Sequence, residues 1–211
     1  MSVTDPRLTV RAFAELLALP LYEQVRILNE QKNPGEGPQA FKVPFYSPAL
    51  RGIRTFYRTG NSAAALTSAK IELATLGLAA RRKHNARVLS QFEKSAEASR
   101  RLTLAPQIQQ KLSIGKLELR NQFDLQAVEG GAPRLIYYNF RTVAIDKGTA
   151  VTALELAHWV LEENGITIPI KRLQYVDLSG GTVVGTTSRR ASTITKAKRN
   201  ADLITTIWPT I

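Results

Sequence analysis

The sequence predicts an α/β protein in which a central sheet flanked by helices follows a helical N-terminal region. Apolar residues recur at helical spacing through most of the first hundred residues, whereas polar and apolar residues alternate after Pro106. Glycine-containing turns separate the alternating runs, and helical segments interrupt and end this half of the chain. The predicted order is helices followed by β-β-α-β-β-α, which is typical of an α/β core.

The first segment is predicted to form two helices and a loop. Thr4 or Asp5 can cap the first helix, with Pro6 at its first position, and Pro20 begins the second helix. Three prolines and two glycines within residues 32–44 predict a loop that is also a candidate hinge.

Further helices are expected before the alternating half of the chain. Residues 47–60 contain a short helix with Ser47 as its cap, Pro48 in its first turn and Gly60 as its end. Residues 61–102 are rich in alanine and are predicted to form two helices or one kinked helix.

The second half of the chain alternates between strands and helices. Its expected elements, in chain order, are alternating strands at 111–128, a hairpin turn at 129–133, a strand at 134–143, an amphipathic helix at 149–165, a strand hairpin at 170–186 and a basic helix at 189–211. We therefore divide the chain into a helical N-terminal region, residues 1–60, and an α/β core, residues 61–211.

Composition constrains the partner and the compartment. Lys and Arg total 29 against 17 acidic residues, giving a net charge of +12, and such an excess attracts polyanions such as nucleic acid. The absence of cysteine excludes disulfides, thiolate zinc sites and cysteine nucleophiles. No apolar run approaches the roughly 18 residues of a membrane span. We therefore expect a soluble, cytoplasmic protein without a membrane partner.

The stretch LIYYNFRT, Leu135–Thr142, departs from the pattern of a buried strand. Its first four residues are apolar or aromatic, but Asn139 and Arg141 follow with a spacing of two, which places both on one face of a strand. Polar residues of this kind can protect a sheet edge. An amide beside a guanidinium also suggests a binding site whose ligands have been replaced.

Other segments contribute residues in a recognisable order. A helix carries His84 in RRKHNARVLSQF, a strand ends in Asp124 in LRNQFDLQ, the next strand carries YNFR (Tyr138–Arg141), and the following helix carries ELAHW (Glu155–Trp159). This order resembles the PD-(D/E)XK nuclease superfamily, closest to its RecB-like branch, over roughly residues 75–211. The resemblance implies a restriction-endonuclease-like fold with a mixed central sheet, so residues 61–211 would be a nuclease-like core.

In that family, two carboxylates and a histidine hold Mg²⁺ or Mn²⁺, which activates a water molecule beside the phosphate. The resemblance implies Asp124 and His84 as metal ligands, with Asn139 in place of the second carboxylate and Arg141 in place of the lysine. Asparagine carries no charge, and arginine is permanently protonated. We therefore expect an Asp124–Arg141 ion pair at the former metal position, and a protein that holds nucleic acid without a cofactor and without cutting it.

Two alternatives stay open. In the first, Glu155 supplies the second acid of an active Mg²⁺- or Mn²⁺-dependent nuclease, together with His84 and Asp124, and Arg141 or Lys147 replaces the family's lysine. In the second, the chain is a structural subunit whose positive charge binds an acidic partner protein.

Basic residues cluster in three segments with few interleaved acids. We expect them to bind nucleic acid, DNA in preference to RNA, in DNA processing or defence against foreign DNA. The N-terminal helices are expected to close over the bound strand or to dock a partner protein. The predicted nucleic-acid-binding residues are Arg51, Arg54, Arg58, Arg81, Arg82, Lys83, Arg87, Arg141, Arg189 and Arg190.

Overall fold

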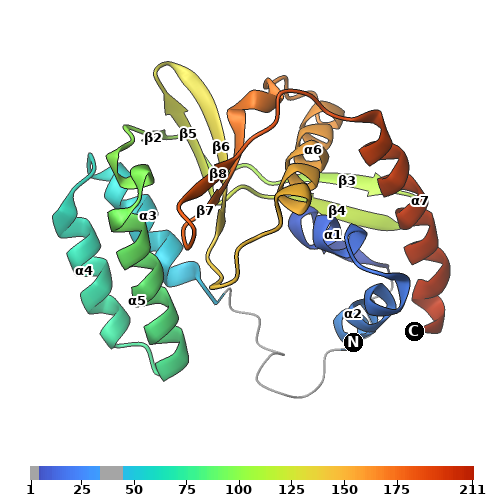
Figure 1. Cartoon of the computed structure of the whole chain (residues 1–211), viewed down its shortest axis with the longest axis horizontal. Helices are drawn as coiled ribbons and strands as arrows, with labels where there is room; N and C mark the ends of the chain where they lie inside the picture. The colour runs from blue at the N-terminus through green and yellow to red at the C-terminus, as the bar shows by residue number, and fades with distance from the viewer. Residues whose placement is uncertain (1–4, 34–44) are drawn as a thin grey trace.

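The computed structural model describes residues 5–33 and 45–211, which form two mixed sheets and their flanking helices (Figure 1). The larger sheet contains, in spatial order, β2 (Thr103–Leu104), β5 (Leu125–Glu129), β6 (Ala132–Asn139), β7 (Leu173–Asp177) and β8 (Thr182–Val184). The smaller sheet contains β1 (Arg7–Thr9), β4 (Leu117–Asn121) and β3 (Gln110–Ile114). The predicted α/β fold class, with a mixed sheet flanked by helices, is confirmed.

Helices in the described residues account for most of the remaining chain. They are α1 (Val10–Leu17), α2 (Leu21–Lys32), α3 (Ser47–Arg58), α4 (Ala63–Ala74), α5 (Ala79–Lys94), α6 (Lys147–Glu163) and α7 (Ala191–Ile207). Short 3₁₀ turns occur at Ala96–Ser99, Ile170–Arg172 and Trp208–Thr210. The alanine-rich stretch thus forms two helices, α4 and α5, which was one of the two predicted alternatives.

The prediction of a first helix beginning at Pro6 is wrong. Arg7–Thr9 instead forms β1, which pairs in parallel with Glu118–Arg120 of β4 and buries Leu8. The helix begins later, where the Thr9 hydroxyl accepts a hydrogen bond from the Ala12 N–H at 3.2 Å. The second helix does begin after Pro20. Most of the predicted hinge loop, and Thr4, lie outside the described residues.

The connections of the larger sheet follow from local chemistry. β5 and β6 are antiparallel and joined by Gly130 and Gly131, whose φ angles of +56° and +78° suit a two-residue hairpin turn that other residues adopt with difficulty. β6 and β7 are parallel, and a parallel pair requires a crossover, which α6 supplies. The predicted hairpin turns at residues 129–133 and 170–186 are confirmed.

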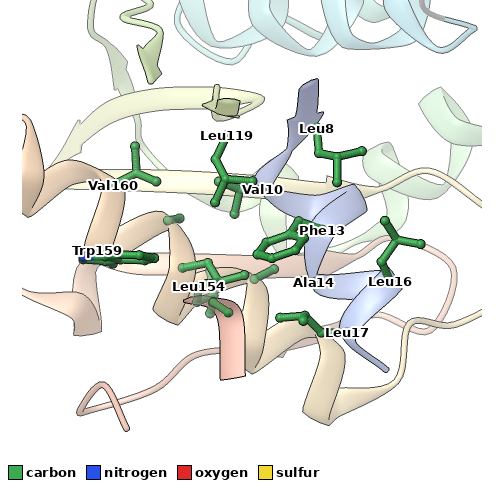
Figure 2. Close-up of a cluster of buried hydrophobic side chains, with 14 of the residues drawn as sticks. Leu8, Val10, Phe13, Ala14, Leu16, Leu17, Leu119, Leu154, Trp159 and Val160 are labelled. Carbon is green, nitrogen blue, oxygen red and sulfur yellow. The ribbon is translucent and has the colours of Figure 1, made fainter. Parts of the chain in front are cut away.

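Two hydrophobic cores lie on opposite faces of the larger sheet. Because side chains alternate along a strand, Leu135 and Tyr137 of β6 enter the core formed with α1, α6 and α7, whereas Ile136 and Tyr138 enter the core formed with α3, α4 and α5. Figure 2 shows the first core, where Phe13 of α1 lies among side chains from α6 and the smaller sheet. The first sixty residues therefore contribute to both cores.

Within the described residues, no helix combines the length and apolar character that crossing a lipid bilayer requires.

Candidate functional site

The candidate site lies where β6 and β7 end, beside the start of β5. Asn139, the last residue of β6, pairs in register with Asp177, the last residue of β7. Asp124 directly precedes β5, and its Oδ2 accepts a hydrogen bond from the Tyr138 N–H at 2.8 Å. The carboxyl ends of parallel strands are a common position for binding sites in α/β sheets. The fold thus brings Asp124 and Asn139 to one edge of the sheet.

The Asp124 carboxylate binds a guanidinium from α1. Arg11 Nη1 donates to Asp124 Oδ2 at 2.9 Å and to the Tyr138 carbonyl at 3.1 Å. The Arg11 guanidinium also lies 5.1 Å from the ring centre of Tyr137, a favourable cation–π distance. Burial lowers the pKa of Arg11, but the negative charge of Asp124 and two nearby tyrosines outweigh burial and leave that pKa above its usual value. Arg11 is therefore a permanent cation at this carboxylate.

The expected ion pair between Asp124 and Arg141 is not formed. Arg141 Nη1 and Nη2 each lie 3.2 Å from Glu15 Oε2, and the Arg141 side chain is 66% exposed. β6 ends at Asn139, so strand alternation does not continue to Arg141. Instead the Asn139 amide builds a turn, accepting from the Arg141 N–H at 3.1 Å and donating to the Val143 carbonyl at 2.8 Å.

One helix face therefore supplies both ion pairs of the site. Arg11 and Glu15 are the only charged residues of α1, and a spacing of four places them on the same side of the helix. Arg11 binds Asp124, and Glu15 binds Arg141, so each joins α1 to the edge of the larger sheet. Sequence reasoning missed both residues, although two opposite charges at this spacing on an otherwise apolar helix were a visible signal.

A cavity of about 270 Å³ adjoins the Glu15–Arg141 pair. Asp146 lies in its wall and caps α6 by accepting a hydrogen bond from the Thr149 N–H at 2.8 Å, and this bond lowers the pKa of Asp146. The charged residues in the wall of the cavity are Arg141 and the two carboxylates Glu15 and Asp146. Its other lining residues are Ala18, Leu19, Asn139, Val143, Ala144, Ile145 and Tyr175.

Two of the predicted catalytic or metal-binding residues lie elsewhere. His84 is on α5, where its ring packs edge-to-face against Phe45 with 5.8 Å between ring centres. Glu155 is fully buried on α6 and accepts hydrogen bonds from Arg190 Nε at 2.8 Å and from Thr193 Oγ1. Glu155 thus joins α6 to α7 and does not meet Asp124.

These positions decide how well a metal ion fits. Across residues 5–33 and 45–211, no three His, Cys, Asp or Glu side chains lie close enough together to hold one. At the predicted position, the Asp124 carboxylate already accepts hydrogen bonds from Arg11 and from the Tyr138 N–H. The Asn139 side-chain amide is hydrogen-bonded within its own turn. The residues of this edge therefore do not fit a divalent-metal site.

The chain matches no model of a known protein family and no curated protein.

Most of the predicted nucleic-acid-binding arginines have partners within the protein. Arg58 and Lys83 are exposed, and Arg141 is exposed but paired with Glu15. The partners of the others are Glu72 for Arg51, Gln107 and the Asp124 carbonyl for Arg54, Phe45 and Ser47 for Arg81, the Leu76 and Gly77 carbonyls for Arg82, the Phe140 carbonyl for Arg87, Glu162 for Arg189 and Glu155 for Arg190.

Two of these arginines, Arg54 on α3 and Arg87 on α5, approach the candidate site from the helices of the second core. Arg54 Nη2 donates to the Asp124 carbonyl at 2.8 Å, and Arg87 Nη2 donates to the Phe140 carbonyl at 2.7 Å. Burial lowers the pKa of Arg54, but Arg54 remains protonated because the ordinary pKa of arginine is very high. Together with Arg11 and Arg141, four guanidinium groups therefore surround the ends of β5 and β6.

Proposed function

We propose that this chain binds nucleic acid, DNA in preference to RNA, through a nuclease-like core in which the Arg11–Asp124 ion pair replaces the metal ion. The protein then holds its partner without cutting it. The nuclease resemblance further suggests a cytoplasmic role in DNA processing or in defence against foreign DNA.

The order of structural parts supports this proposal. A helix with His84 is followed by Asp124 at the start of β5, a hairpin to β6, the crossover helix α6 and the hairpin β7–β8. Apart from the intervening strands β2 to β4, this is the order that the nuclease resemblance implies, although Asp124 precedes β5 and does not end a strand as expected. The two strand ends that would carry the acidic residues, at Asp124 and Asn139, meet at one edge of the sheet.

The 2.9 Å contact between Arg11 and Asp124 carries the non-cutting part of the proposal. Two unit charges about 4 Å apart at an effective dielectric near 20 attract by roughly 4 kcal/mol before desolvation is subtracted. A divalent ion would have to displace this guanidinium, and the uncharged Asn139 offers it no second carboxylate. The arrangement therefore favours the ion pair over a metal ion.

The charge around this edge supports nucleic-acid binding. The chain carries a net charge of +12, and the exposed Arg141 guanidinium can bind a phosphate through paired donors in exchange for its contact with Glu15. Because Arg54 and Arg87 already donate to carbonyl groups, they act mainly as half-buried positive charge beside the site.

Binding and cleavage assays test the proposal together. Labelled DNA and RNA, single- and double-stranded, are titrated with the protein at low salt and then incubated with Mg²⁺ or Mn²⁺. We expect binding that weakens with salt, a preference for DNA, and no cleavage. Cleavage that Asp124→Ala abolishes would establish an active nuclease instead. Absence of binding at low salt would leave the acidic-protein partner as the better explanation of the charge.

A further inference from the structure

The outward face of the smaller sheet carries only polar and charged side chains. Leu8, Leu117 and Leu119 face the first core, so the alternate positions point to solvent. We name this surface the basic sheet face, and its residues are Arg7 and Thr9 on β1, Glu118 and Arg120 on β4, and Lys111 and Ser113 on β3. Arg7, Lys111 and Arg120 have side chains 56%, 59% and 47% exposed.

Three cations of the basic sheet face share one carboxylate. Glu118 lies 2.6 Å from Arg120 Nε, 3.6 Å from Lys111 Nζ and 4.0 Å from Arg7 Nε. A single negative charge cannot balance all three, so the face keeps an excess of two positive charges. The hydrogen bond from Arg120, with the charges of Lys111 and Arg7, lowers the pKa of Glu118 despite partial desolvation.

Two of these cations are placed directly opposite each other. Lys111 of β3 and Arg120 of β4 are register partners in the antiparallel pair. Like charges at directly opposed positions destabilise a sheet. Glu118 offsets part of that repulsion, and a further anion bound beside the two side chains would offset the rest. Their charge is therefore oriented toward solvent, unlike that of Arg54 and Arg87, which donate to carbonyl groups inside the fold.

We propose that the basic sheet face is a docking surface for the phosphate backbone of nucleic acid. This inference rests on the proposed function and adds a second contact surface to the candidate site. Neighbouring strands lie about 4.8 Å apart, so Lys111 and Arg120 present two positive charges close together on one face, where they can contact neighbouring phosphates. Gln109 and Gln122, which lie just beyond the ends of β3 and β4, are hydrogen-bonded to each other at 2.8 Å and add neutral polar groups.

The same residues define what the basic sheet face recognises. None of its six side chains is aromatic, so it offers no platform on which bases could stack. Contacts made by Lys and Arg to phosphates position a nucleic acid but carry no sequence information. Binding through this face is therefore independent of base sequence and strongly dependent on salt.

The test compares two double variants with the same loss of charge. Lys111→Gln/Arg120→Gln removes the opposed pair, and the control Lys94→Gln/Arg101→Gln removes two exposed cations elsewhere. Fluorescence anisotropy with a labelled DNA duplex and a labelled single strand gives Kd across a salt series. We expect the slope of log Kd against log salt to fall by about 1.8 for the duplex and about 1.4 for the single strand in the first variant only.

Two further variants separate binding from folding. Glu118→Gln adds net positive charge to the basic sheet face, so its Kd at low salt should fall below the wild-type value. Lys111→Gln alone removes an exposed cation whose 3.6 Å ion pair with Glu118 contributes little to folding, so its Tm should not drop although its binding weakens. A sheet variant with the wild-type slope, or one that changes no more than the control, overturns this docking surface and leaves the proposed function standing. A wild-type chain that binds no nucleic acid overturns both.

Discussion

The Arg11 guanidinium and the Asp124 carboxylate lie 2.9 Å apart although the two residues are 113 positions apart in the sequence. Asp124 has a side chain only 9% exposed, and that of Arg11 is 33% exposed. Removing the guanidinium leaves a nearly buried carboxylate whose remaining donor is the Tyr138 N–H. We expect Arg11→Ala to lower the free energy of unfolding by about 3 kcal/mol, measured by urea denaturation.

An exposed arginine provides the control for that loss. Arg26 bonds to Glu23 and Glu30 on α2, but its side chain is 58% exposed, so Arg26→Ala should cost far less stability than Arg11→Ala. Adding Asp124→Asn to Arg11→Ala should recover part of the loss, because no buried charge then remains. A loss in Arg11→Ala no greater than in Arg26→Ala would show that the pair contributes little to folding.

Local sequence patterns predicted the elements near this site but not its ion pairs. The period-two spacing and the Gly-Gly turn identified β6 and the hairpin before it. They could not show that Asn139 ends the strand, because that ending depends on side-chain bonds to residues up to Val143. The partner of Asp124 is contributed by α1, and only the packing of α1 against α6 and the sheet brings Arg11 there.

The first strand illustrates the same limit for the fold. Asp5, Pro6 and the residues after them carry helix-start signals, which predicted a helix from Pro6 onward. In the structure, β4 offers an edge to the chain, and the parallel pairing of Arg7–Thr9 with that edge outweighs local helix propensity. A strand of three residues has no pattern long enough to detect, so its existence depends on a distant partner.

Glu155 is predicted to stabilise the fold and to have no part in cleavage. It is fully buried, and Arg190 Nε and Nη2 donate to it at 2.8 and 3.1 Å. Glu155→Ala leaves Arg190 and Thr193 without their acceptor and creates a cavity between α6 and α7. We expect a loss of about 3–4 kcal/mol in the free energy of unfolding, from chemical denaturation.

Glu162 is the matched control, since it also lies on α6 and pairs with Arg189, but its side chain is 44% exposed. Glu162→Ala should cost less than about 1 kcal/mol. If Glu155→Ala were as stable as Glu162→Ala, the assignment of Glu155 as the connection between the two helices would be wrong.

Acid should destabilise the protein partly through Glu129. Hydrogen bonds from Arg100 lower the pKa of Glu129, with a further contribution from Arg134, against a smaller opposing effect of desolvation. The folded pKa lies below the unfolded value of about 4.3, so this carboxylate contributes its full stability above that pH. The contribution is lost as pH falls through the folded pKa.

We therefore expect Glu129→Gln to be less stable than the wild type at pH 7, by about 1–2 kcal/mol. Its stability should also decline less steeply between about pH 5 and pH 3, because the titrating group is gone. Urea denaturation across this pH range measures both effects. If the free energy of unfolding of the two proteins declined equally between about pH 5 and pH 3, the pKa of Glu129 would be the same in the folded and unfolded states.

The last prediction concerns divalent metal ions at Asp124. Because Arg11 already neutralises this carboxylate, millimolar Mn²⁺ should leave the Tm of the wild type unchanged, as it should that of Asp124→Ala. The double variant Arg11→Gln/Asn139→Asp removes the guanidinium and introduces a second carboxylate, which is the ligand type that hard cations prefer. Its Tm should rise with Mn²⁺, since a ligand that binds only the folded state stabilises it by mass action. A wild-type Tm that rises with Mn²⁺ and fails to rise in Asp124→Ala would instead make Asp124 a metal ligand and contradict the replacement of the metal by Arg11.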